Sequence, residues 1–204
     1  MLELGQLDVK DAQLVQHGLR ALGLYSGTTF GRPGPLTAAA YAEYRGQTRT
    51  GHFAEELARV AEGEVGTREE GNNGGVRIRD YQRATWLPVG PWPWCAAFVC
   101  WCFQTAAART EPGVPRPQTA GAWDFERWAR KVGAELLKPP GPARRGDIVV
   151  FRFSHIGIVE RDEVEGRGYL YTIEGNTDGA GGREGDGVWR KTRPASQVRS
   201  LIRV

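Results

Sequence analysis

The chain has few cysteines, few histidines and no long apolar segment. Three cysteines are an odd number in 204 residues, and two of them, Cys100 and Cys102, fall in one expected helix, so they do not form the paired framework of a disulfide-rich secreted domain. We therefore expect a protein made in a reducing compartment. No apolar run approaches the length of a membrane span, so we expect no insertion into a membrane.

We also expect no signal peptide, because residues 1–8 show no basic region followed by an apolar one. We expect synthesis in the cytoplasm, so that any action outside it needs release or transport by another component. Basic and acidic residues nearly balance, 27 against 24, and no nucleic-acid-binding motif accompanies the net charge of +3. This charge favours weak attraction to acidic polymers such as cell-wall material, and we expect no nucleic-acid partner.

What the chain does contain is enough apolar material for a core, with 40% hydrophobic residues and seven tryptophans. In the first part of the chain apolar residues recur at helical spacing, and the last such segment, residues 122–131, is expected to be an amphipathic helix. From Gly146 the period changes to two, and short β-rich runs follow at residues 147–153, 155–161, 169–173, 188–191 and 197–204. Connections this short permit only antiparallel pairing. The sequence therefore predicts an α+β fold in which an antiparallel meander packs against helices.

A small helical unit is expected in front of this domain. It consists of two helices joined by a loop rich in glycine, threonine and proline, at residues 9–24, 27–35 and 36–44. The polar residues 45–51 are interpreted as a linker to a helix at 53–63. The expected domains are residues 1–46 and residues 52–204.

The most informative stretch begins at Pro91, where prolines and tryptophans precede a run of small, apolar and aromatic residues without a charge. Pro93 is tolerated at a helix start, so we expect a buried helix with Cys95 in its first turn. The free N–H groups and the helix dipole there favour the thiolate, which attacks carbonyl carbons. Free cysteine is also often a small buried hydrophobe, as we expect of Cys100 and Cys102. Cys95 alone leaves both interpretations open.

A partner for the thiol is offered by His155, the only histidine in the expected sheet region. A lone histidine at a strand end is more often structural. A cysteine at a helix start and a histidine on a neighbouring sheet are, however, the arrangement that a thiolate–imidazolium pair requires. Glu174 and Asn176 lie two residues apart and hence on one face of the next strand. Either can accept the second imidazole N–H and orient the ring.

Four motifs in this order resemble the CHAP domain, the cysteine, histidine-dependent amidohydrolase/peptidase related to the NlpC/P60 and papain-like enzymes. They are Pro-Trp-Cys-Ala-Ala-Phe-Val at 93–99, Arg-Arg-Gly-Asp-Ile-Val-Val-Phe at 144–151, Ser-His-Ile-Gly-Ile-Val-Glu at 154–160 and Glu-Gly-Asn-Thr at 174–177. The resemblance implies a papain-like fold. It also implies Cys95 as the nucleophile, His155 as the general base, and Glu174 with Asn176 as orienting and polar partners.

The resemblance also bears on metal and substrate binding. Some CHAP lysins bind calcium through an Asp-x-Asp-x-Tyr run just before the cysteine, whereas this chain has Trp-Leu-Pro-Val-Gly at 86–90. We therefore expect no metal and no other cofactor. Tyr81 resembles the tyrosine that NlpC/P60 relatives place beside the nucleophile, and we expect Tyr81 and Trp94 to bind substrate.

The N-terminal residues resemble the small helical peptidoglycan-binding domain found beside many cell-wall hydrolases. The resemblance rests on Val15, Gln16, Leu19, Leu22, Gly23, Tyr25, Gly27, Gly34, Pro35, Thr37, Ala40 and Tyr44. The Asp-Gly usual in the central loop of that domain is replaced here around Phe30. A packing appendage without a ligand stays open as the alternative.

Together these resemblances imply a monomeric peptidoglycan hydrolase of the endolysin type, made in the cytoplasm and acting on the wall after holin-type release or secretion. It would hydrolyse an amide through a thioester acyl-enzyme. A muramoyl-alanine amide, a stem-peptide bond and a cross-bridge all stay open as the target. Two alternatives remain: a secreted interbacterial amidase toxin, and a non-catalytic wall-binding or structural phage protein.

Overall fold

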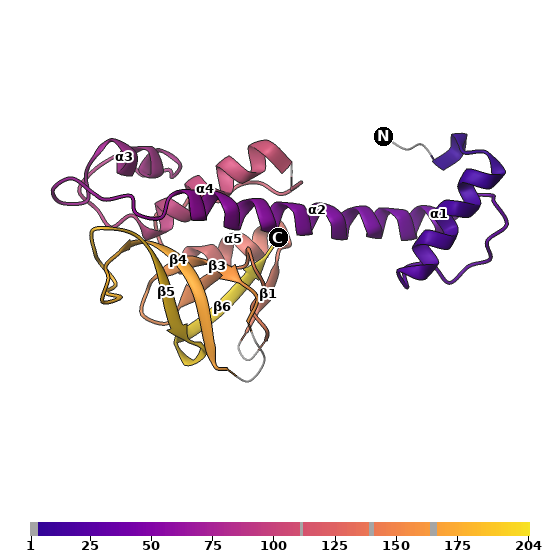
Figure 1. Ribbon diagram of the computed structural model, residues 1–204. Coiled ribbons are helices and arrows are strands. Elements are labelled where there is room, and N and C mark those ends of the chain that lie inside the picture. Colours follow the sequence, from indigo (N-terminus) through magenta and orange to yellow (C-terminus); the bar gives the residue numbers. More distant parts are fainter. Residues whose placement is uncertain (1–3, 111, 139–140, 164–166) are drawn as a thin grey trace. The chain divides into compact units, whose positions relative to one another are not determined.

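The computed structural model describes residues 4–110, 112–138, 141–163 and 167–204. The chain forms two compact units, Met1–Gly51 and His52–Val204 (Figure 1). Among the helices of the described residues, none is both long enough and apolar enough to cross a bilayer.

The N-terminal unit contains a short 3-10 helix, η1 (Leu4–Gln6), α1 (Val9–Ala21) and the first part of α2 (Pro35–Gly63). Asp8 caps α1 by accepting a 2.8 Å hydrogen bond from the Asp11 N–H. A small cluster of Leu19, Tyr25 and Ala40 holds the two helices together. The first helix and the return to helix after the loop are therefore confirmed.

Gln16 holds the loop of this unit in place from inside. Its side-chain amide donates to the Arg32 carbonyl at 3.2 Å and to the Thr37 hydroxyl at 3.1 Å, and its oxygen accepts from the Gly31 N–H at 3.1 Å. A buried amide must be satisfied in this way. Gln16 thus fixes the loop between the helices without an Asp-Gly pair.

The prediction that residues 45–51 form a linker between two helices is wrong, because α2 is one continuous helix over Pro35–Gly63. Pro35 occupies the first helical position, where its missing N–H is not needed. No proline follows within the helix, and a glycine such as Gly46 or Gly51 costs a helix only about 1 kcal/mol. The boundary between the two units, at Gly51 and His52, therefore falls inside a helix.

The C-terminal unit is built on one six-stranded antiparallel sheet with the strand order β1-β6-β2-β3-β4-β5. Its strands are β1 (Glu135–Leu137), β2 (Ile148–Phe151), β3 (Ile156–Arg161), β4 (Tyr169–Thr177), β5 (Gly187–Pro194) and β6 (Val198–Arg203), with a 3-10 turn, η2 (Ala195–Gln197), before the last. The α+β class and the antiparallel pairing are confirmed. The meander is confirmed for β2 to β5 only, because β6 returns to pair with β2 and so covers an edge that would otherwise be unpaired.

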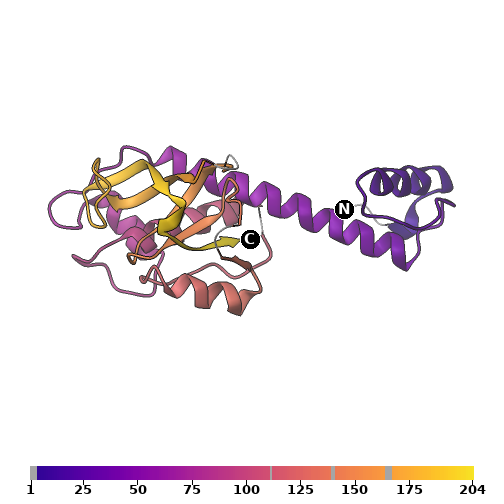
Figure 2. The ribbon, with the colours of Figure 1, turned by 90° about the horizontal axis from the view of Figure 1, so that it is seen from below.

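Helices α3 (Val76–Arg83), α4 (Cys95–Thr110) and α5 (Asp124–Val132) belong to the same unit. Figures 1 and 2 show the strands, in orange to yellow, as a layer with these helices on one side. α4 contacts β3 and β4, and most of its residues are buried. A helix that is apolar on all sides is the expected centre of a core.

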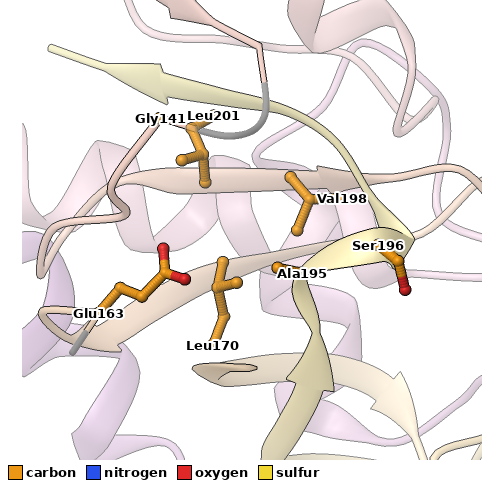
Figure 3. Close-up of a pocket in the computed structure, with 7 residues that line it drawn as sticks. All are labelled: Gly141, Glu163, Leu170, Ala195, Ser196, Val198 and Leu201. Carbon is orange, nitrogen blue, oxygen red and sulfur yellow. The ribbon is translucent and has the colours of Figure 1, made fainter. Parts of the chain in front are cut away.

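The two faces of the sheet enter different clusters. Ile148 and Val150 join the main core with α4, whereas Val149 and Phe151 join a second cluster on the other face, as alternation along a strand requires. A pocket of about 300 Å³ opens at the second cluster (Figure 3). Its lining residues are Gly141, Glu163, Leu170, Ala195, Ser196, Val198 and Leu201. None of the expected site residues lines it.

Candidate active site

Cys95 is the first residue of α4, which confirms the expected start of this helix. It is 7% exposed. A 2.9 Å hydrogen bond from the Phe98 N–H to the Trp94 carbonyl closes the first turn around it. The first N–H groups of a helix have no partner within the helix. The thiol therefore lies at the positive end of α4, where negative charge is stabilised.

His155 is held by the tight turn between β2 and β3. Ser154, just before it, has a φ of 58°, which few residues other than glycine adopt. The Phe151 N–H donates to the His155 carbonyl at 2.9 Å. The imidazole is fully buried and stacks on Phe153 and Phe151, with ring centroids 5.8 and 6.1 Å away. The turn and the two phenyl rings thus fix the direction of the imidazole.

Glu174, on β4, lies against this ring. Its Oε2 is 3.0 Å from Nε2 of His155, and both side chains are fully buried. The distance suits a hydrogen bond, although within the described chain neither ring nitrogen is aligned well enough with a partner to form one. Catalytic hydrogen bonds often become aligned only when substrate binds. The geometry makes Glu174 the acidic neighbour of the imidazole.

The same contacts perturb the pKa values of both groups. Burial alone would lower the pKa of His155, but the interactions with Cys95 and Glu174 outweigh it and raise the pKa to about 9. Burial alone would raise the pKa of Glu174, but the hydrogen bonds from Arg193 and the close contact with His155 lower it to about 2. At neutral pH the site therefore holds a carboxylate and favours an imidazolium.

Asn176 does not share the face of Glu174, contrary to expectation. The pairing of β4 with β5 shifts register between Glu174 and Thr177, and Asn176 has a φ of 56°, which breaks the alternation of side chains. Its Oδ1 accepts from the Trp94 N–H at 3.1 Å. Its Nδ2 donates to Oδ1 of Asn73 at 3.1 Å and to the Gly185 carbonyl at 3.0 Å. Asn176 thus holds the backbone just before Cys95.

Tyr81 and Trp94 are fully buried beside α4, with their rings 5.5 Å apart. The Tyr81 hydroxyl donates to Glu64 at 2.5 Å, and the Trp94 indole donates to Glu69 at 3.0 Å. These bonds satisfy the polar atoms of both rings inside the protein. The structure places the two side chains in the core, where they support α4 and present no surface to a substrate.

Arg193, on β5, is a site residue that the sequence did not reveal. Its guanidinium donates to both carboxylate oxygens of Glu174. The expected strand at 188–191 ends before it, and nothing distinguishes it from the many other arginines of the chain. One signal was available, because a buried carboxylate requires a counter-charge, and the strand after β4 is the nearest source of one.

A pocket of about 230 Å³ opens at the thiol. Its lining residues are Leu87, Trp92, Pro93, Cys95, Ala120, Gly121, Ala122, Ser154 and Arg183. The walls are mainly apolar, and Arg183 is the only lining residue with a permanent charge. Cys95 therefore faces a space that a substrate can enter, whereas Cys100 and Cys102 are wholly buried. Among the described residues, no three His, Cys, Asp or Glu side chains are grouped to hold a metal.

With this geometry in place, the comparison with protein families gives one match. Residues 88–176 match the CHAP domain model. The match supports a CHAP-domain protein and includes Cys95, His155, Glu174 and Asn176, but not Arg193. CHAP domains are typically cysteine- and histidine-dependent amidohydrolases, and the match implies peptidoglycan as the substrate. No curated protein and no solved structure matches the chain.

We expect the buried pair of His155 and Glu174 to give the free energy of unfolding a characteristic pH dependence. The folded pKa of His155, about 9, lies above its ordinary 6.5, so its stabilisation is complete below pH 6.5 and is lost as the pH rises through 9. The folded pKa of Glu174, about 2, lies below its ordinary 4.5, so its stabilisation is present above pH 4.5 and is lost as the pH falls through 2. Urea unfolding across this range measures both losses.

A matched variant separates the contribution of the thiol. Cys95→Ala removes one of the two groups that raise the pKa of His155, so the alkaline loss of stability should be smaller and should be complete at a lower pH. A wild-type stability that stays flat between about pH 6.5 and pH 9 would contradict the raised pKa of His155.

Proposed function

We propose that the protein is an endolysin-type peptidoglycan hydrolase that cleaves an amide bond of the cell wall through a thioester acyl-enzyme on Cys95. The observation that carries the proposal is the buried contact of His155 with Glu174, which the thiol of Cys95 completes beside a pocket of about 230 Å³. A non-catalytic wall-binding protein has no need of such a site. Buried charged groups cost free energy, and they are typical of catalytic positions.

In the proposed mechanism each nitrogen of the imidazole has its own role. Because Nε2 faces Glu174, Nδ1 accepts the proton of the thiol. The thiolate then attacks the carbonyl carbon of the scissile amide. The oxyanion is stabilised by the backbone N–H of Cys95, which is one of the unpaired donors at the start of α4. His155 returns the proton to the leaving amine, and water then hydrolyses the thioester.

The pocket favours a peptide substrate that carries a carboxylate. Leu87, Trp92 and Pro93 provide an apolar wall, and Arg183 provides a cation at the same pocket. The side chains of Arg183 and Glu184, which form an ion pair, are both exposed. A substrate carboxylate can therefore take the place of Glu184 at little cost in free energy. Stem peptides of peptidoglycan offer such carboxylates.

The test is digestion of purified sacculi followed by mass spectrometry of the released fragments, with and without EDTA. We expect new amide-derived termini in both samples, and the masses identify which bond is cleaved. Intact sacculi after exposure to the folded protein would contradict the proposal. Loss of cleavage in EDTA that calcium restores would contradict the metal-free chemistry.

We propose in addition that the N-terminal unit binds the wall and that the protein acts as a monomer after holin-type release or secretion from the cytoplasm. Cys95, His155 and Glu174 all lie in the unit His52–Val204, so the proposed chemistry needs no second subunit. The resemblance of the N-terminal unit to wall-binding domains favours an endolysin over an interbacterial toxin. A pocket of about 200 Å³ in this unit, lined by Val15, Gly18, Leu19, Leu22, Tyr41 and Tyr44, offers a place for a ligand.

We expect Tyr41→Ala/Tyr44→Ala to weaken binding to sacculi by about tenfold or more, since aromatic rings stack on sugar and peptide groups and each tenfold corresponds to about 1.4 kcal/mol. Co-sedimentation with sacculi, using the inactive Cys95→Ala background, measures the affinity. Tyr169→Ala is the matched control, because Tyr169 is 50% exposed in the other unit. Cleavage of soluble muropeptides should be unchanged. Undiminished affinity would favour the packing-appendage alternative.

A further inference from the structure

The carboxylate of Glu174 has a second partner besides His155. Nε of Arg193 donates to Oε1 at 2.9 Å and to Oε2 at 3.2 Å, and Nη2 donates to Oε2 at 2.5 Å. The Thr172 hydroxyl adds a 2.6 Å hydrogen bond to Oε1. Two-point contact by a planar guanidinium fixes the plane of a carboxylate. Arg193 thereby determines that Oε2 faces the imidazole.

The setting of Arg193 is unusual for an arginine. Its side chain is 8% exposed, and its guanidinium lies 5.3 Å from the ring centre of Phe153 and 5.5 Å from that of Phe151. These are the two rings that stack on His155. Arg193 and His155 therefore share both their acidic partner and their aromatic neighbours.

Charge balance shows what Arg193 contributes to the thiol chemistry. The guanidinium contacts Glu174 on β4, and the same carboxylate contacts His155, just before β3, which is the proposed partner of Cys95. Lys191 on β5 lies beside Gly181, as the guanidinium itself does. With Arg193 present, the buried Glu174 carboxylate is neutralised, and a thiolate–imidazolium pair adds no net charge. Without Arg193, the same pair leaves one uncompensated negative charge in the interior, which is costly. Glu174 or the thiolate would then take up a proton.

The third nitrogen of the guanidinium, Nη1, connects Arg193 to the loop beside the pocket at Cys95. Nη1 donates to the Gly181 carbonyl at 2.9 Å. Gly181 lies in the loop between β4 and β5, which also contains Arg183, a lining residue of the pocket at Cys95. One guanidinium thus joins the carboxylate behind His155 to the loop that borders the substrate space.

We propose that Arg193 is a positioning residue of the reaction, which holds Glu174 ionised and oriented toward His155 and anchors the 178–186 loop to the same carboxylate. The inference rests on the proposed Cys95–His155 pair. It extends the site beyond the residues of the CHAP match, which ends at residue 176. A purely structural ion pair would affect stability but not the reactivity of the thiol, so the two interpretations can be separated.

The test is the rate of alkylation of Cys95 by iodoacetamide as a function of pH, with the labelled residue located by tandem mass spectrometry. It needs no substrate. In Arg193→Gln we expect the midpoint of the acidic limb to move up by about one pH unit. Loss of the cation in contact with Glu174 raises the pKa of that carboxylate, and a Glu174 that takes up a proton no longer stabilises the imidazolium partner of the thiolate. At a pH below both midpoints, alkylation is then about tenfold slower. Arg190→Gln, on the same strand in an exposed pair with Glu160, should keep the wild-type profile.

Arg193→Lys keeps the charge but loses the fork that binds Glu174 and Gly181 together. We expect a smaller shift of the acidic limb and faster proteolysis within the 178–186 loop. This variant decides the question if Arg193→Gln does not fold. A wild-type alkylation profile in folded Arg193→Gln, or a wild-type profile with an equally protected loop in Arg193→Lys, overturns the proposal.

The alkylation test of Arg193 and the sacculus test of the proposed function can fail independently of each other. If the alkylation profiles shift as expected while sacculi stay intact, the role of Arg193 stands and the peptidoglycan assignment fails. If sacculi are cleaved and the profiles do not shift, the peptidoglycan assignment stands and the role of Arg193 fails.

Discussion

Cys95→Ala is expected to abolish the release of fragments from sacculi, with a loss of activity on the order of 10⁴-fold or more. Removal of a covalent nucleophile leaves only the binding and oxyanion contributions. The substitution deletes one sulfur atom at a 7% exposed position, so the fold should persist. Turnover of a soluble muropeptide by equal amounts of folded wild type and variant gives the comparison.

The other two thiols provide the control. Cys100 and Cys102 lie on the same helix and are fully buried, and burial raises the pKa of both. Neither reaches the pocket. Cys100→Ala and Cys102→Ala should lower stability through the cavities they leave while keeping turnover. Substantial turnover in Cys95→Ala would remove the basis of the thiol mechanism.

Glu174→Gln is expected to lower turnover by on the order of a hundredfold or more and to move the acidic limb of the pH profile. The carboxylate stabilises the imidazolium that forms when Cys95 is deprotonated, and a charged hydrogen bond is about twice as strong as a neutral one. The substitution also leaves the Arg193 guanidinium without its buried counter-charge, which can cost about 3–5 kcal/mol of stability. Glu174→Gln/Arg193→Met removes both charges and separates the kinetic effect from that loss.

Asn176→Ala is the matched comparison on the same strand. Its amide contacts the Trp94 N–H, Asn73 and Gly185, so its loss loosens the backbone in front of Cys95. We expect a smaller decrease in turnover and an unshifted acidic limb. If Asn176→Ala is the more damaged variant and Glu174→Gln keeps the wild-type pH profile, the assignment of the two roles is wrong.

The parts of the site that the sequence predicted are those determined by local rules. The helix start at Cys95 follows from Pro93 and the uncharged run behind it, and the strand that begins after His155 follows from its period of two. Fold class followed from the same change of period. The antiparallel pairing of neighbouring strands could be predicted from the short connections between them, and β2 to β5 pair in this way.

The parts that were missed depend on contacts between distant residues. Arg193 meets Glu174 only because β4 and β5 pair in a particular register. Asn176 turns toward α4 because its φ is positive, which no pattern of apolar residues signals. The single helix α2 was divided in the prediction because its polar middle shows no apolar stripe, although helical propensity alone allows it to continue.

The central claim is that Cys95 is acylated by the substrate, and acid-quenched mass spectrometry of the intact protein tests it most directly. The wild type, mixed with a soluble muropeptide and quenched within one turnover, should gain the mass of the acyl fragment, and the added mass should map to Cys95. His155→Ala should show no such gain. Cleavage of the muropeptide without a covalent adduct, together with activity in Cys95→Ala, would contradict the account.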